Sequence, residues 1–170
     1  MSHTLQIEVD PFLCATQERE ISGELVYEKL QRIQGDIESS SDPIKANLQF
    51  SKVGKFVVLT GRISTNLVLQ CVACLGSIEF PVDIEVKLAV INDESLVNLL
   101  PDGYEPYLLD GDRLSISEVV EDEVVIVLPD FARHEICPID LPKNSASKDF
   151  SLEPDRKKNP FEVLKSLKKH

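Results

Sequence analysis

The fold is decided by residues 46–91, which read ANLQFSKVGKFVVLTGRISTNLVLQCVACLGSIEFPVDIEVKLAVI. Apolar and polar residues alternate at both ends of this stretch, as they do in a half-buried β-strand. Short connections that contain glycine, at residues 53–55 and 71–76, separate the apolar runs. The stretch therefore predicts an antiparallel meander of successive strands. Gly61 indicates a bulge or a close backbone approach, and Pro81 fits a strand start or a sheet edge better than a central position.

Helix signals flank this sheet on both sides. Apolar residues recur at helical spacing within residues 22–34, which predicts a helix there. Ser115 and Glu118 have the spacing of a capping box, and an apolar stripe follows them. Because Pro129 cannot continue a helix, we expect this second helix to span residues 116–127.

A third helix is expected at the C-terminus, where Asn159 can cap a helix and Pro160 suits its first position. Residues 37–43 and 92–109 predict mostly irregular connections. The sequence thus predicts an α+β fold, in which an antiparallel β-meander sheet has two or three flanking helices and a C-terminal tail helix. We expect three regions: a single α+β domain over 1–137, a polar linker over 138–158 and a C-terminal NPF helix over 159–170.

Composition excludes several classes of protein. Of the 170 residues, 42% are hydrophobic and 28% are charged, which is typical of a globular rather than a disordered chain. No apolar run is long enough to span a bilayer, and no secretory signal is visible. Four cysteines without such a signal favour a reducing compartment. We therefore expect a cytoplasmic protein with no membrane partner.

Charge is divided unevenly along the chain. The formal net charge is −11, but residues 143–170 carry eight basic and four acidic side chains, a local charge of +4. Residues 1–142 therefore carry −15. The basic segment is either a solvated flank or a surface that meets an anion such as RNA. On the second interpretation, the candidate RNA-binding residues are Arg156, Lys157, Lys158, Lys165, Lys168 and Lys169.

The densest chemical signal is the CxxC motif formed by Cys71 and Cys74. Two intervening residues let both thiolates face one metal ion from a tight turn. His134 and Cys137 repeat this spacing later in the chain, so the four residues form a candidate Cys3His zinc site. The alternatives are that the cysteines pack as small hydrophobes, as we expect of Cys14, or form a redox pair. No cofactor is required by the sequence, and zinc is the candidate.

Signals for catalysis are weak. No GxSxG, Walker A, HExxH or GxGxxG motif occurs, and only three histidines are present. Glu121, Asp122 and Glu123 are consecutive, so on a helix they splay around the axis instead of forming a paired acid–base site. We interpret them as a solvated helix face. We expect neither an enzyme nor a small-molecule substrate.

Four motifs occur in a characteristic order along residues 46–170. They are the CxxC after a valine-rich strand, the acidic and valine-rich helix ending in Leu-Pro, the pair His134 and Cys137, and the NPF triplet at 159–161. This ordered set resembles the YceD family, the bacterial large ribosomal RNA subunit accumulation proteins. The resemblance implies a non-enzymatic role in large-subunit biogenesis, in the processing or accumulation of 23S ribosomal RNA. It supplies no catalytic residues.

Three hypotheses for the function follow. The first is a large-subunit biogenesis factor that binds a ribosomal RNA precursor or an assembly intermediate, with a ribosomal protein as a further candidate partner. The second is a protein-interaction adaptor without direct RNA contact, in which the NPF helix docks on a protein. The third is a CxxC thiol oxidoreductase, which is disfavoured because residues 71–80 carry no basic side chain to lower the pKa of a thiol.

Overall fold

The computed structural model describes residue 5, residues 7–27, residues 30 and 32, residues 37–40 and residues 42–138. All of them belong to one unit, Met1–Ile139. From residue 139 onward, the predicted linker and the predicted NPF helix lie outside the described residues. The six candidate RNA-binding residues lie outside them too, and their role stays a prediction.

The larger of two sheets has six strands in the order β2-β4-β5-β6-β7, and β3 also pairs with β5. The strands are β2 (Glu20–Leu25), β3 (Ile37–Ser40), β4 (Ile44–Val53), β5 (Phe56–Gln70), β6 (Ser77–Ile91) and β7 (Glu105–Leu108). All pairs are antiparallel except β6 with β7, which is parallel. The α+β class and the antiparallel meander from β4 to β6 are thus confirmed.

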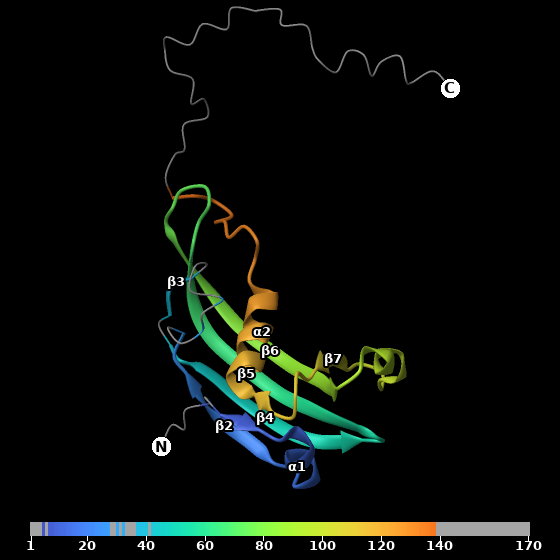
Figure 1. Cartoon of the computed structure of the whole chain (residues 1–170). Helices are drawn as coiled ribbons and strands as arrows, with labels where there is room; N and C mark the ends of the chain where they lie inside the picture. Colours follow the sequence, from blue (N-terminus) through green and yellow to red (C-terminus); the bar gives the residue numbers. More distant parts are fainter. Residues whose placement is uncertain are drawn as a thin grey trace, which may run out of the picture. The chain divides into compact units, whose positions relative to one another are not determined.

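The remaining elements are short strands and helices around this sheet. A two-stranded sheet joins β1 (Glu8–Val9) to β8 (Leu114–Ser115). The helices are α1 (Pro11–Thr16), the 3-10 helix η2 (Glu94–Leu99) and α2 (Ile116–Val127). Figure 1 shows α2 lying across one face of the curved large sheet. Within the described part of the chain, no helix has the length and hydropathy needed to cross a membrane.

Helix α2 has the bounds that the sequence predicts. The Ser115 hydroxyl accepts a hydrogen bond from the Glu118 backbone N–H at 3.4 Å. The helix ends where Leu128 turns extended before Pro129, since a residue that precedes proline avoids helical geometry. Valine is a weak helix former, so packing must stabilise this helix. The apolar side chains that it buries are Ile116, Val119, Val120 and Val124.

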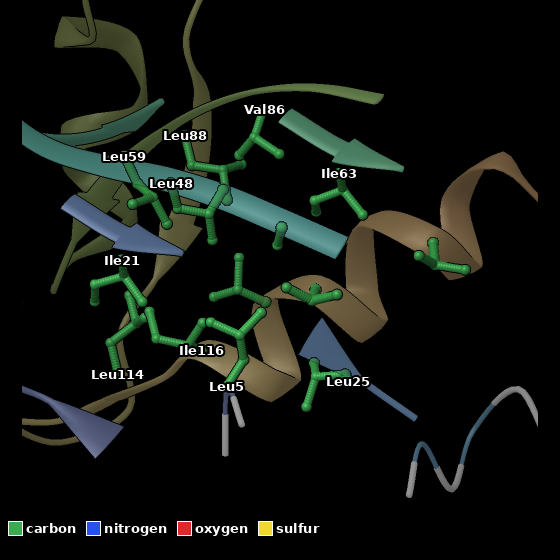
Figure 2. Close-up of a cluster of buried hydrophobic side chains, with 14 of the residues drawn as sticks. Leu5, Ile21, Leu25, Leu48, Leu59, Ile63, Val86, Leu88, Leu114 and Ile116 are labelled. Carbon is green, nitrogen blue, oxygen red and sulfur yellow. The ribbon is translucent and has the colours of Figure 1, made fainter. Parts of the chain in front are cut away.

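The hydrophobic core lies between α2 and the sheet face that it covers. Figure 2 shows side chains of the sheet and of α2 pointing toward one another. Leu48, Leu59 and Ile63 from the sheet, and Ile116 from α2, are completely buried. Each such side chain contributes roughly 1.5–3 kcal/mol of transfer free energy. This burial outweighs the poor helix propensity of the valine-rich segment.

Gly61 lies in the middle of β5, opposite Leu48 of β4 and Val86 of β6. A Cβ atom at this position would lie 2.0 Å from the Asn47 carbonyl oxygen and 2.8 Å from the Leu48 Cα. Favourable contacts between heavy atoms need about 3.5 Å or more. The close backbone approach predicted from the sequence is therefore present.

Pro81 lies within β6, opposite Asn66 of β5. Strand β7 pairs only with β6 residues 88–91, so no described strand lies on the other side of β6 at Pro81. A proline removes a backbone donor and is tolerated where no neighbouring strand needs it. The predicted edge position is confirmed.

The helix predicted over residues 22–34 is wrong. Residues 22–25 belong to β2, which pairs along its whole length with β4 and buries Ile21 and Leu25. Gly23 stands between these two on the same strand face and interrupts the apolar alternation, which hides the strand in the sequence. Of residues 26–34, the structure describes 26, 27, 30 and 32, and none of these is α-helical.

Two predicted connections also contain regular structure. Residues 37–40 form β3 and pair with β5, while residues 92–109 contain η2 and β7. Strands β3 and β7 are defined by pairing with a neighbouring strand, and their own composition gives little sign of it. Pro106 is accommodated because β7 is the last strand of the sheet.

The sequence predicted that the three consecutive carboxylates of α2 form a solvated helix face. This prediction is wrong for Glu121. Glu121 is only 7% exposed. Its Oε1 accepts a hydrogen bond from the Arg32 backbone N–H at 2.6 Å, and the Arg32 guanidinium lies 2.5 Å from Asp122 Oδ1. Glu121 therefore ties residue 32 to the helix, while charge from Arg32 compensates the carboxylates.

Candidate metal centre

Cys71 and Cys74 lie in the turn that joins β5 to β6. The Cys71 N–H donates to the Gly76 carbonyl at 2.8 Å, and the Leu75 N–H donates to the Cys71 carbonyl at 2.8 Å. Leu75 has a φ of 60°, a left-handed conformation that reverses the chain direction within the turn. The turn is thus held by its own backbone hydrogen bonds, with Cys74 inside it.

His134 and Cys137 reach this turn from the segment that follows α2. In Figure 1 this segment, coloured orange, runs to the green turn between β5 and β6. The Val72 N–H donates to the Ala132 carbonyl at 2.9 Å and joins the two segments. Because the halves of the site are separated by about 60 residues, the tertiary fold brings them together.

The four candidate ligand atoms have spacings that suit one tetrahedral ion. All lie within 4.8 Å of one another. The Cys71 and Cys137 sulfurs are 3.9 Å apart, and the Cys74 sulfur is 3.4 Å from His134 Nδ1. Tetrahedral bonds of ordinary zinc–sulfur and zinc–nitrogen length would place such atoms about 3.8 and 3.5 Å apart. The donor set therefore fits a metal ion.

The His134 ring is oriented by a second hydrogen bond. Its Nε2 lies 3.2 Å from the Ser77 carbonyl oxygen. A carbonyl oxygen can only accept, so Nε2 donates, and in the neutral ring the lone pair of Nδ1 then lies on the side of the Cys74 sulfur. Metal-ligating histidines are commonly held by a hydrogen bond of this kind.

The electrostatics of the site favour a thiolate at Cys71, which is completely buried. Burial raises the pKa of this thiol, but backbone N–H groups of Cys74, His134 and Ala73 directed at the sulfur lower the pKa to about 5. Burial raises the pKa of the Cys137 thiol, as do its hydrogen bonds with Cys74 and Cys71. The thiolate is the form of cysteine that binds metals, so the lowered pKa of Cys71 favours binding of a cation.

All four predicted metal ligands are thus brought together. Among the described residues, this is the one group of three or more potential ligand side chains that could hold a metal ion. Cys14 is buried in the core, as predicted, and is not part of the group. The sequence did not indicate the Ser77 carbonyl, because a backbone acceptor leaves no trace in residue type.

Together, the fold and the site define a small α+β protein in which a Cys3His group able to hold a metal lies between a strand turn and the segment that follows α2. The chain belongs to the YceD family: the family model described as "Large ribosomal RNA subunit accumulation protein YceD" matches residues 59–168. A curated relative of that same name from Haemophilus influenzae is 25% identical over 171 residues, covering 96% of each chain. No solved structure matches the chain.

Proposed function

We propose that this protein is a non-enzymatic, cytoplasmic factor that supports accumulation or processing of 23S ribosomal RNA during assembly of the large subunit. The observation that carries the proposal is the family match, which includes both halves of the metal site and most of the C-terminal basic segment. The relative's name refers to accumulation of large-subunit ribosomal RNA. Its direct target is an rRNA precursor or an assembly intermediate.

The metal centre has a structural role in this proposal, with zinc as its ion. Three cysteines and one histidine complete a tetrahedron, which leaves no open position for a substrate or an activated water. Zinc, when bound, supplies bonds that hold the β5–β6 turn to the segment after α2. The residues that would hold it are Cys71, Cys74, His134 and Cys137.

RNA contact is assigned to the basic side chains of the C-terminal segment, because the rest of the chain carries −15 and repels a polyanion. Arg156, Lys157 and Lys158 precede the NPF helix predicted by the sequence, and Lys165, Lys168 and Lys169 lie on or just beyond it. Residues three and four apart share one face of a helix, so the last three lysines would meet the same stretch of phosphates.

The cellular role is tested by deleting the gene and measuring the ratio of 23S to 16S ribosomal RNA. We expect the ratio to fall, and the full chain to restore it. A ratio that does not change on deletion would contradict the proposed role. Complementation with Cys74→Ser then reports whether the metal site contributes in the cell.

Direct RNA contact is tested with a chain truncated after Asp155. Binding to 23S ribosomal RNA is measured across a salt series, and each lost phosphate contact should lower the slope of log affinity against log salt by about 0.7–0.9. We expect weaker binding and a shallower slope than for the full chain. Equal affinity and equal slope would show that the basic segment makes no RNA contact.

Two other functions are weaker candidates. A thiol oxidoreductase usually places its CxxC at a helix N-terminus, whereas Cys71 and Cys74 lie between two strands. A protein-interaction adaptor is favoured by one specific observation, the exposed apolar side chains around the metal centre.

A further inference from the structure

Exposed apolar side chains gather on the two segments that carry the metal ligands. Among the described residues, the four most exposed large hydrophobic side chains are Ile136 (88%), Phe131 (78%), Ile126 (71%) and Leu75 (67%). All four lie either in the β5–β6 turn or between the last turn of α2 and Cys137. Val72, in the same turn, is also exposed.

The two segments that carry these side chains lie next to one another, because the four candidate ligand atoms are within 4.8 Å of one another. Val72 and Leu75 each follow a cysteine ligand, and Ile136 precedes another. Phe131 precedes Ala132, whose carbonyl accepts the Val72 N–H at 2.9 Å. We call Val72, Leu75, Phe131 and Ile136 the knuckle surface. Apolar side chains that are gathered on a soluble domain commonly mark an interaction site.

The charges around the knuckle surface distinguish between classes of partner. Three acidic residues, Glu79, Asp130 and Glu135, occur in the two ligand-bearing segments and the start of β6, where Arg133 is the single basic residue. An RNA-binding surface needs several cations to meet phosphates, and this surface has a negative surplus. Exposed apolar side chains that have exposed acidic residues close to them in the chain instead suit a basic protein.

We propose that the knuckle surface docks a basic protein, which inserts an apolar side chain among Val72, Leu75, Phe131 and Ile136 and places its cations beside Glu79, Asp130 and Glu135. The acidic body as a whole, at −15 over residues 1–142, attracts such a partner over a longer range. The inference goes beyond the proposed function and does not depend on RNA contact by the C-terminal segment.

A metal ion held by Cys71, Cys74, His134 and Cys137 would suit this role, because it would fix the backbone beneath the exposed side chains. A loop that is already ordered loses less conformational entropy when a partner binds. The backbone bonds within the turn and the Val72–Ala132 hydrogen bond act in the same direction. The backbone beneath the knuckle surface is therefore held in place before a partner binds.

The first measurement is photocrosslinking in living cells from the full-length chain, with p-benzoylphenylalanine in place of Phe131. A second chain carries the same group in place of Leu99, which is 57% exposed and lies in η2, after the opposite end of β6. Adducts are identified by mass spectrometry as protein, RNA or a second copy of the chain. We expect basic proteins from position 131 that are not recovered from position 99.

The second measurement uses the identified basic protein, purified, as the binding probe. We expect Phe131→Ser and Ile136→Ser to weaken binding at least about tenfold, because a few side chains that a partner buries completely carry most of the binding energy. Leu99→Ser should leave affinity unchanged. Affinity should also fall with added salt. Zinc content and thermal stability are measured for each variant. A variant that disturbs the metal site would lose zinc or stability, whereas a variant that removes only a partner contact would keep both.

Several outcomes would overturn the proposal. They are RNA adducts at position 131, adducts to a second copy, an acidic protein as the crosslinked partner, or no adduct beyond that seen at position 99. Equal affinity of Phe131→Ser, Ile136→Ser and the unchanged chain would overturn it as well. The ratio of 23S to 16S ribosomal RNA is a separate readout, so failure of the docking proposal and failure of the proposed function are distinguishable.

Discussion

Replacing Gly61 with alanine tests the close approach of the β4 backbone to this position. The added Cβ would lie 2.0 Å from the Asn47 carbonyl oxygen, where an ordinary contact is about 3.5 Å. Strands β4 and β5 would have to separate by more than about 1 Å at this point, because the obstacle is backbone and cannot rotate away. Gly61 also pairs with Val86 of β6, so the displacement would extend across three strands.

We expect Gly61→Ala to lower the free energy of unfolding by about 3 kcal/mol, the upper end of the range for overpacked cores. For a domain of this size, that loss corresponds to a decrease in Tm of about 6–12 °C. Urea unfolding followed by far-UV circular dichroism is the suitable assay, because the chain has no tryptophan.

Gly76→Ala is the matched control. Its Cβ would lie 3.5 Å from the Cys74 sulfur and 3.7 Å from His134 Cε1, which are ordinary contacts. We expect its free energy of unfolding to change by about 0.5 kcal/mol or less. If Gly61→Ala were as stable as Gly76→Ala, the inferred approach of β4 to β5 would be refuted.

Three further changes test the site and the helix. Cys74→Ser should remove most of the zinc that copurifies with the chain, measured by elemental analysis, while Cys14→Ala should retain it; equal zinc in both would contradict the assigned ligands. Glu121→Ala should lower the free energy of unfolding by about 1–3 kcal/mol, seen in urea titrations, because the Arg32 N–H loses its acceptor. Burial and two neighbouring carboxylates raise the pKa of Glu123, so Glu123→Gln should stabilise the protein at pH 7 by about 0.5 kcal/mol or less. That gain should shrink as the pH falls through the raised pKa, where the natural carboxyl becomes neutral; a gain that persists at pH 3 would show another cause.

The central sheet and α2 were readable from the sequence because their signals are local. Strands β4 and β6 alternate apolar and polar residues, and Ser115 and Pro129 mark the limits of α2. The candidate metal-binding cluster could be predicted because CxxC and HxxC spacing reflects how two ligands reach one ion. The spacing within each motif does not predict that the two motifs lie close together, because the tertiary fold determines that.

Strand β2 and the environment of Glu121 were predicted wrongly because they depend on partners that are distant in the chain. Strand β2 is defined by its pairing with β4, and Gly23 interrupts its apolar face. Burial of Glu121 depends on Arg32, 89 residues away in the chain. Helix α1 was missed although a local signal exists: Asp10 caps it by accepting hydrogen bonds from Phe12 and Leu13, and Pro11 occupies its first turn.

The pairing of β1 with β8 has a consequence for synthesis of the chain. Glu8 and Val9 find their strand partners only when residues 114 and 115 have been made. At ordinary translation rates, the interval between residue 9 and the end of α2 is roughly 6–24 s. Until then, the apolar residues of β2 and β4 that have already been synthesised lack α2, the helix that covers this face of the sheet. The nascent chain is therefore exposed to chaperones and proteases until its last described helix emerges from the ribosome.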